Sequence, residues 1–325
     1  MKYWKPLETK TKTSLPEKTS EKKSEEKEIS FQGFVKHKHK EDERQPMLIL
    51  VCGETGVGKT FRNIKEIQNY LKGNPATHRK GRKVLIFDVN DDDYECYITV
   101  NPDAIRDLKN IQARRIRPLN RYGQTMSLDE KRDMVERMVK QFTQGLLVLE
   151  DLDKYMTGAK GQTIVGLLTT NRHHGLDIMI SHQSIAKITT TEFQNCTWLR
   201  LHKQVDDISR YRSRIPNYFL VRIATLIVEE QYLIGNIRFF VYINMRKLLL
   251  RGCSREAYIR ACKKYLDTEE NGMIKRMMLE RNFNGHLIYK NRNEVVIQLI
   301  SELLRYHEVN YHSPITTEKL EEEAV

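Results

Sequence analysis

Apolar and polar positions alternate along the chain in blocks that predict buried strands separated by amphipathic helices. Residues 47–52 form an unbroken apolar run, as expected of a strand that is covered on both faces. Similar runs recur along the chain, with helical spacing of apolar residues between them. The expected strands are 47–52, 83–89, 145–149, 177–181 and 196–201, and the expected helices are 61–72, 103–111, 127–143 and 162–172. This alternation predicts an α/β fold with a mostly parallel sheet flanked by helices.

The two ends of the chain show different patterns. Residues 1–45 are rich in Lys, Glu, Ser and Thr, so they bury too little apolar surface to offset their ordering entropy, and we expect a disordered arm. Residues 46–249 are expected to form the α/β domain, including a helix at 216–230 and a strand at 238–245. Amphipathic helices at 254–266 and 294–306 predict a helical C-terminal appendage over 250–325, which ends in an acidic tail.

A glycine-rich loop follows the first apolar strand and matches the pattern G-x-x-x-x-G-K-[ST] in full. Glycine permits backbone conformations in which several amide groups surround a phosphate, and the helix that follows points its positive end at the same anion. We expect Lys59 to reach the β- and γ-phosphates of ATP and the Thr60 hydroxyl to ligate Mg²⁺. The loop consists of Gly53, Glu54, Thr55, Gly56, Val57, Gly58, Lys59 and Thr60.

Two carboxylates end the third strand. Glu150 and Asp151 follow four apolar residues, and we expect this strand to lie beside the strand that carries the phosphate loop. An acid there holds hydrated Mg²⁺, and a second acid orients and deprotonates the attacking water. We assign Glu150 the metal and Asp151 the base. In P-loop ATPases the usual order is Asp then Glu, so the reversed order leaves this division of roles open.

The next strand ends in Gln183, which can hold the hydrolytic water because an amide both donates and accepts hydrogen bonds. Arg172 lies at the end of the preceding helix, where it either complements the helix dipole or reaches the γ-phosphate of a neighbouring subunit. Three other arginines are rival candidates for that reach: Arg200, Arg212 and Arg214.

Net charge changes the picture of partners. A formal charge of +12 favours a polyanionic partner such as nucleic acid, or an anionic membrane surface. The five cysteines show no C-x-x-C pair or zinc spacing, so we expect reduced thiols in a protein that is not secreted. No apolar run reaches the roughly 18 residues of a membrane span, because charged side chains interrupt the longest candidate, 218–234.

The combination of phosphate loop, acidic strand end and Gln-tipped strand resembles the FtsK–HerA superfamily of DNA-pumping ATPases. Over residues 46–245 it looks most like the genome-packaging ATPases of membrane-containing and double-jelly-roll viruses, on the runs N-R-H-H-G at 171–175 and S-H-Q-S at 181–184. The resemblance implies a hexameric or pentameric ring that threads DNA, double-stranded or alternatively single-stranded, using ATP. It also implies a capsid vertex or viral membrane protein as a further partner, and a location in the host cytoplasm or virion.

Basic side chains in expected loops are the candidate DNA contacts, because phosphate contacts give affinity without sequence preference. One cluster holds Arg114, Arg115 and Arg117. Lys160 lies in a glycine-rich stretch after the acidic strand, which we expect to form a pore loop.

Four alternatives stay open. A filamentous-phage-type ATPase that extrudes DNA would be expected to carry a transmembrane segment. A replication helicase or helicase loader would be expected to have a helical lid, for which the C-terminal helices leave room. A nucleotide-operated switch would not need the pair Glu150 and Asp151. A small-molecule kinase would be expected to have an arginine-rich lid and a less basic chain.

Overall fold

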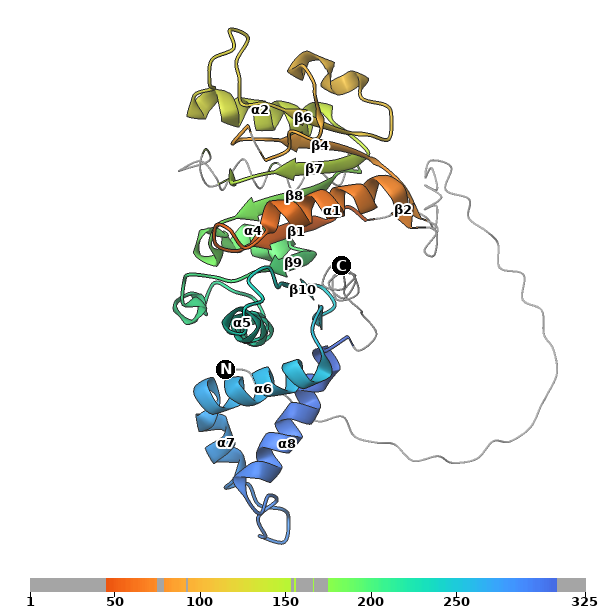
Figure 1. Ribbon diagram of the computed structural model, residues 1–325. Coiled ribbons are helices and arrows are strands. Elements are labelled where there is room, and N and C mark those ends of the chain that lie inside the picture. Colours follow the sequence, from red (N-terminus) through yellow and green to blue (C-terminus); the bar gives the residue numbers. More distant parts are fainter. Residues whose placement is uncertain are drawn as a thin grey trace, which may run out of the picture. The chain divides into compact units, whose positions relative to one another are not determined.

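A mostly parallel sheet forms the centre of the protein. The computed structural model describes residues 45–74, 79–91, 93–152 and 175–308, together with Tyr155 and Gly166. The strands are β1 Leu48–Cys52, β4 Lys83–Phe87, β5 Ile98–Thr99, β6 Ala113–Ile116, β7 Gly145–Leu149, β8 Asp177–His182, β9 Trp198–Leu201, β10 Val241–Asn244 and β11 Leu249–Arg251, with a separate pair formed by β2 Gly73–Asn74 and β3 Arg79–Lys80. The nine-stranded sheet has the order β11-β10-β9-β1-β8-β7-β4-β6-β5 (Figure 1). Strands β9 to β5 run parallel, and β10 and β11 add an antiparallel edge.

Helices cover both faces of this sheet. The faces are covered by α1 Lys59–Lys72, α2 Leu128–Gln141, α4 Thr190–Asn195 and α5 Tyr218–Leu233. Helices α6 Arg255–Glu269, α7 Asn271–Met277 and α8 Arg292–Leu303 follow along the chain and pack beyond α5 (Figure 1). Successive strand residues point to opposite faces, so Val51 of β1 packs in one buried cluster with Ile67 of α1, while Leu50 packs in the other. That second cluster contains Val139 of α2 and Leu220 of α5. The expected α/β fold, with a mostly parallel sheet between helices, is confirmed.

The sheet differs from the expectation in one respect that matters for the site. The acidic strand β7 does not lie beside β1, because β8 pairs with β1 on one side and with β7 on the other. The strand order therefore places the Gln-tipped strand next to the phosphate loop and the acids one strand further away.

The region 102–116 also differs. A short 3-10 helix, Pro102–Asp107, replaces the helix expected at 103–111, and the chain then forms strand β6. Two arginines within its four residues hide β6 from a search for apolar runs, yet its pattern is mostly buried. Arg115 compensates for this burial by pairing with Asp88 at 2.8 Å. The expected helix at 162–172 lies outside the described residues except for Gly166, which is helical.

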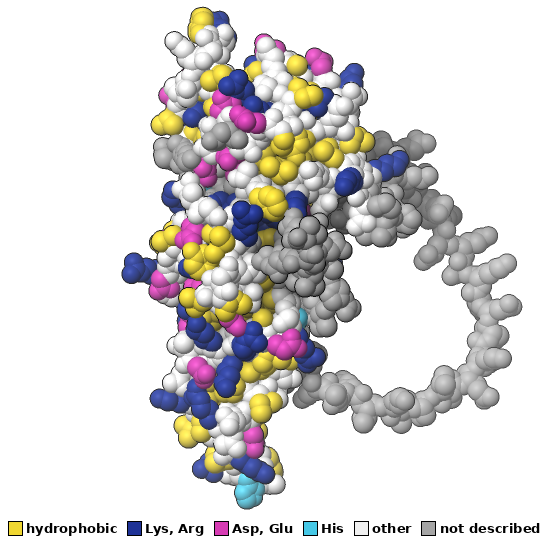
Figure 2. All heavy atoms as spheres, viewed as in Figure 1, with side chains coloured by type: hydrophobic (Ala, Val, Ile, Leu, Met, Phe, Trp, Pro, Cys, Tyr) yellow, Lys and Arg dark blue, Asp and Glu magenta, His cyan; other side chains and the backbone are white. Residues whose placement is uncertain are grey.

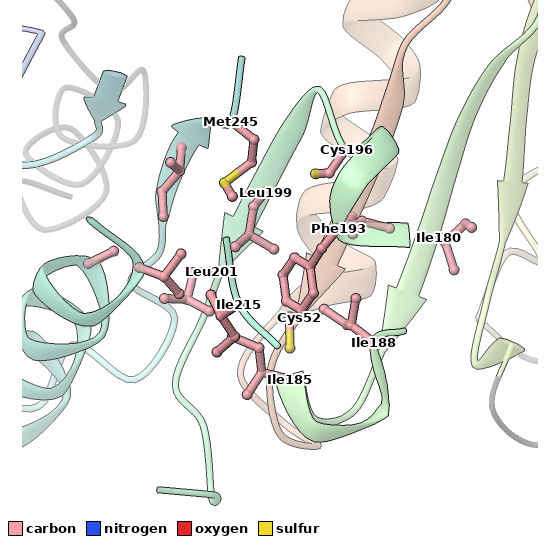
Figure 3. Packing of buried hydrophobic residues seen from close by; sticks show 14 of the residues in the cluster. Cys52, Ile180, Ile185, Ile188, Phe193, Cys196, Leu199, Leu201, Ile215 and Met245 are labelled. Atoms are coloured by element: carbon pink, nitrogen blue, oxygen red, sulfur yellow. The ribbon is translucent and has the colours of Figure 1, made fainter. Parts of the chain in front are cut away.

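The turn that follows β8 is fixed by packing on the face opposite α1. Ile185, Ile188 and Phe193 converge on Cys52 at the end of β1 (Figure 3). After this turn a capping box begins α4, in which the Thr189 hydroxyl accepts a hydrogen bond from the Glu192 backbone amide at 3.2 Å. The strand end before Gln183 is therefore held in place by apolar contacts on one side of the sheet.

The C-terminal helices extend the same core. Tyr258 of α6 is fully buried, and its hydroxyl donates to the Leu303 carbonyl at 2.9 Å. Both α6 and α8 contribute side chains to the cluster that contains α5. None of the helices in the described ranges has the length and apolar surface that a membrane crossing requires.

Candidate nucleotide-binding site

The phosphate loop is suspended between the ends of two strands. The Gly53 amide donates to the His182 carbonyl at 3.2 Å, and the Glu54 amide donates to the Lys203 carbonyl at 2.9 Å. Helix α1 begins at Lys59, directly after Gly58. The unpaired amides of a helix N-terminus attract anions, so the strand, loop and helix expected around the motif are present, and phosphate binding by these residues stays a prediction.

Two glycines of the loop are required by its surroundings. A Cβ at Gly53 would lie 2.6 Å from the Cβ of His202, which is closer than two carbon atoms approach. Gly58 has a φ of 78°, in the left-handed region, and a Cβ there would lie 3.2 Å from Cγ of Arg238. The need for glycine in this loop therefore follows from a close approach at Gly53 and from a left-handed backbone at Gly58.

Lys59 closes the loop in this structure. Its Nζ donates to the carbonyls of Gly53 and Glu54, each at 2.7 Å. Burial lowers the pKa of Lys59, while the carboxylates of Asp151 and Glu150 act in the opposite direction. The ammonium group thus lies within the electrostatic reach of both acids, where a bound triphosphate would place its β- and γ-groups.

Asp151 and Gln183 meet at the tips of adjacent strands. Gln183 Nε2 donates to Asp151 Oδ2 at 3.2 Å, although 32 residues separate them. Asp151 has a φ of 43°, in the left-handed region that Asp tolerates better than most residues. The two expected catalytic side chains are therefore brought together beside the phosphate loop, with the amide orienting the carboxylate.

Glu150 is held differently. It is only 4% exposed, and Oε1 accepts from Asn63 Nδ2 at 2.5 Å and from the Tyr94 hydroxyl. Burial raises the pKa of this carboxyl, and hydrogen bonds from Tyr94, Ser181 and Asn63 oppose the rise. The Glu150 carboxylate thus accepts hydrogen bonds from donors of the protein itself, and it is buried away from a ligand.

These contacts bear on where Mg²⁺ would bind. Magnesium prefers one or two carboxylates together with waters and phosphate oxygens. The Thr60 hydroxyl, in the first turn of α1, is an oxygen donor of the kind that completes such a coordination shell, so it fits the ion. The metal role expected for Glu150 fits less well, because its Oε1 already accepts two hydrogen bonds.

A buried polar row lies beneath α1. In the parallel register, Arg200 of β9 and Ser181 of β8 flank Val51 of β1, and Glu150 follows at the same level on β7. Arg200 is fully buried and donates to Asn63 Oδ1 and, at 3.3 Å, to the Lys59 carbonyl. In the described part of the chain, its Nε and Nη1 have no hydrogen-bond partner. Asn63 is the residue that joins this row to the helix.

The polar row was not predicted. Asn63 and Arg200 interrupt apolar patterns, on the buried face of a helix and inside the strand W-L-R-L respectively. A polar residue at a core position is the signal that could have identified them. Their partners could not be predicted, because the pairings span 87 and 137 residues and depend on strand order.

The arginines that were candidates for contacting the γ-phosphate of a neighbouring subunit lie in different surroundings. Arg200 lies inside its own domain and is therefore excluded from reaching a neighbouring subunit. Arg214 donates to the carbonyls of Ala186 and Ile188, at 3.2 and 2.7 Å. Arg212 is more than half exposed and pairs with Glu270 at 3.3 Å. Arg172 lies outside the described residues.

The expected DNA contacts are only partly available. Arg115 is 9% exposed and paired with Asp88, so it is wrongly placed for a phosphate backbone. Arg117 makes two hydrogen bonds to Asp91, at 2.5 and 2.6 Å. Arg114 is partly exposed and donates to its neighbouring carbonyl of Ala113. Lys160 lies outside the described residues.

Comparisons with known proteins give one family model and several solved structures. Residues 47–204 match the family model described as zonular occludens toxin (Zot). No curated protein matches the chain. Among solved structures, the genome packaging NTPase B204 of Sulfolobus turreted icosahedral virus 2, in complex with AMP, is 12% identical over 64% of this chain and 96% of that chain, with a TM-score of 0.46.

Two further solved structures are similar at comparable distance. B204 of Sulfolobus turreted icosahedral virus, described as a DNA-packaging ATPase, is 13% identical over 64% of this chain and 97% of that chain, with a TM-score of 0.43. The N-terminal domain of zonular occludens toxin from Neisseria meningitidis is 16% identical over 48% and 76%, with a TM-score of 0.30. Residues 47–204, just under half of the chain, are thus similar to the Zot family, and the fold is that of a P-loop NTPase.

Proposed function

We propose that the protein hydrolyses ATP to drive DNA translocation, and that it packages viral genomic DNA as a ring-shaped motor. The observation that carries hydrolysis is the contact between Asp151 and Gln183 beside the phosphate loop. A carboxylate oriented by an amide is equipped to take a proton from an attacking water. When bound, Mg²⁺ neutralises charge on the β- and γ-phosphates.

Each side chain has a distinct task in this scheme. Lys59 exchanges its two loop carbonyls for phosphate oxygens, Asp151 acts as the base, and Gln183 keeps the carboxylate and water aligned. Glu150 supports the site from below, because its hydrogen bonds join α1 to the end of β7. In this scheme Mg²⁺ would be held by the Thr60 hydroxyl, waters and phosphate oxygens, and Glu150 has no direct contact with the metal.

DNA as the cargo is supported by the superfamily and by the net charge of +12. The charge is not concentrated on the face shown in Figure 2, where Lys and Arg side chains are dispersed among Asp and Glu. A pore formed by several subunits would collect such dispersed charges around one axis. Arg172, supplied to a neighbouring subunit, would complete the shared site.

An ATPase assay with and without double-stranded DNA tests the proposal. We expect DNA to raise turnover, and we expect the stimulation to fall as salt rises. Asp151→Asn should lower kcat by about 10²–10⁴-fold, as for other general bases, with ATP binding retained. The exposed Asp129→Asn is the matched control and should leave kcat unchanged. Turnover that no nucleic acid stimulates would refute translocation, and full activity of Asp151→Asn would refute the catalytic assignment.

The ring is tested separately by mass measurement of the assembly and by subunit mixing. Lys59→Ala should abolish turnover, and Arg172→Ala should do so by a defect in the neighbour. Mixtures of the two variants should then regain part of the activity, because some sites combine an intact loop with an intact arginine. A monomeric mass with ATP and DNA present would contradict the ring.

A further inference from the structure

An aromatic ring and an arginine flank the phosphate loop on the side away from the catalytic acids. Phe61 follows Thr60 in the first turn of α1, and its side chain is about half exposed. The Arg238 guanidinium lies over this ring, 5.5 Å from its centroid, and the Lys65 ammonium also lies over it, 4.9 Å from the same centroid. Arg238 comes from the segment between α5 and β10, so the pair joins two parts of the chain that are far apart in sequence.

Arg238 is fixed by the phosphate loop itself. Its aliphatic stem packs on Gly58, where an added Cβ would lie 3.2 and 3.4 Å from Cγ and Cδ of the arginine. The side chain is nevertheless exposed. Among the described residues its guanidinium has the Phe61 ring as a neighbour but makes no ion pair. A planar cation is therefore held at the edge of an anion site, and it makes no hydrogen bond to the part of the chain that the structure describes.

Strand order gives the direction in which a bound nucleotide extends. Strand β1 lies between β8 and β9. Asp151 and Gln183 follow β7 and β8 on one side, and the γ-phosphate must face them for hydrolysis. The opposite end of the triphosphate then extends towards β9 and β10, where Phe61 and Arg238 lie.

We propose that Phe61 and Arg238 form the platform for the nucleobase of a purine nucleoside triphosphate. The base stacks on the exposed guanidinium, which the Phe61 ring supports from behind, and the positive charge of Arg238 also attracts the α-phosphate. Both planar groups offer π or cation–π contact to a base. Such contact recognises the flat face of a purine rather than its edge, so the platform accepts GTP as well as ATP. This inference rests on the proposed ATPase function and names the nucleoside subsite of the same site.

Isothermal titration calorimetry with three probes, Mg–ATP, Mg–GTP and Mg–tripolyphosphate, separates base binding from phosphate binding. Phe61→Ala should lower the affinity for ATP and GTP by about tenfold, the usual scale of base stacking, and leave the affinity for tripolyphosphate unchanged. Arg238→Lys keeps the positive charge but removes the planar guanidinium. It should therefore lower the affinity for ATP and GTP and leave the affinity for tripolyphosphate unchanged. Tyr122→Ala is the matched control. The Arg121 guanidinium lies over the Tyr122 ring, 4.7 Å from its centroid, and this pair is not part of the phosphate loop.

The outcomes are distinct. Equal losses for ATP and tripolyphosphate in Phe61→Ala, or unchanged ATP affinity in both variants, would overturn the platform while the ATPase proposal stands. A wild-type protein that binds none of the three probes would overturn both proposals. Thermal unfolding of each variant identifies a folding defect, and the pattern in Arg238→Lys then decides, since this surface substitution removes no buried group.

Discussion

The hydroxyl of Tyr94 offers a sharp test of the buried network beneath α1. Tyr94 is fully buried and donates to Glu150 Oε1, and it also accepts from Asn63 Nδ2 at 3.1 Å. Burial, reinforced by the negative charge of Glu150, raises the pKa of Tyr94 well above its usual value, so the hydroxyl stays a donor throughout the accessible pH range. Tyr94→Phe removes this donor without changing the shape of the ring.

The expected cost follows from what is left behind. A buried acceptor and a buried donor each lose a partner, and an unsatisfied buried group costs ~1–3 kcal/mol. Because Glu150 keeps its bond from Asn63, we expect about 2 kcal/mol of lost stability. That loss corresponds to about a thirtyfold change in the folding equilibrium constant, since ~1.4 kcal/mol is tenfold.

The chain supplies its own control. Tyr97 stacks on Tyr94 with ring centroids 6.4 Å apart, and its buried hydroxyl has no hydrogen-bond partner in the described part of the chain. Tyr97→Phe should therefore be neutral or slightly stabilising. Urea unfolding measures both variants, with equal m-values as the condition for comparing midpoints.

A double-mutant cycle completes the test. In a Glu150→Gln background, Tyr94→Phe should cost less, because the charge-assisted part of the bond is already gone. Equal costs for Tyr94→Phe and Tyr97→Phe, or no coupling to Glu150, would show that the hydroxyl of Tyr94 contributes packing and not a hydrogen bond. The reasoning about the polar row would then be wrong.

Two further predictions concern buried charges. Arg115→Ala should cost about 3–5 kcal/mol, because it leaves Asp88 buried without its partner, whereas Arg114→Ala should change stability little; equal urea midpoints would contradict the buried pair. Burial raises the pKa of Glu150, so the stability it contributes is present below its usual pKa of 4.5 and is lost as the pH rises through the folded value. Glu150→Gln should therefore raise Tm at pH 8 relative to wild type, with the gain disappearing near pH 4; a gain of the same size at both pH values would exclude this cause.

Much of the fold was predictable because the central strands are apolar runs and the helices between them are amphipathic. Strand β6 escaped prediction because Arg114 and Arg115 interrupt its pattern, and its burial depends on a partner, Asp88, that is distant in sequence. The order of the strands in the sheet could not be predicted from the sequence either. Hydrophobic runs specify that strands exist, whereas the insertion of β8 between β1 and β7 is decided by packing of the whole domain.

The site shows the same division. The phosphate loop is a local motif, so its residues and the start of α1 could be placed in advance. Asp151 and Gln183 were predicted individually from strand ends, and the structure shows that they touch. Asn63 and Tyr94 were missed because their roles arise from contacts across 87 and 56 residues with Glu150. The reversed order of the two acids is explained by these contacts, which occupy Glu150.

Asn63 joins α1 to three strands by hydrogen bonds. Its partners are Glu150 at the end of β7, Ser181 in β8 and Arg200 in β9. Fraying of the first turns of α1 would have to break all of these bonds together, so their amide protons should exchange with solvent only when the whole domain opens. The segment that binds phosphate thereby belongs to the most slowly exchanging part of the protein. Nucleotide entry and release must then depend on movement of the surrounding loops, while the helix that carries the phosphate site stays in register with the sheet.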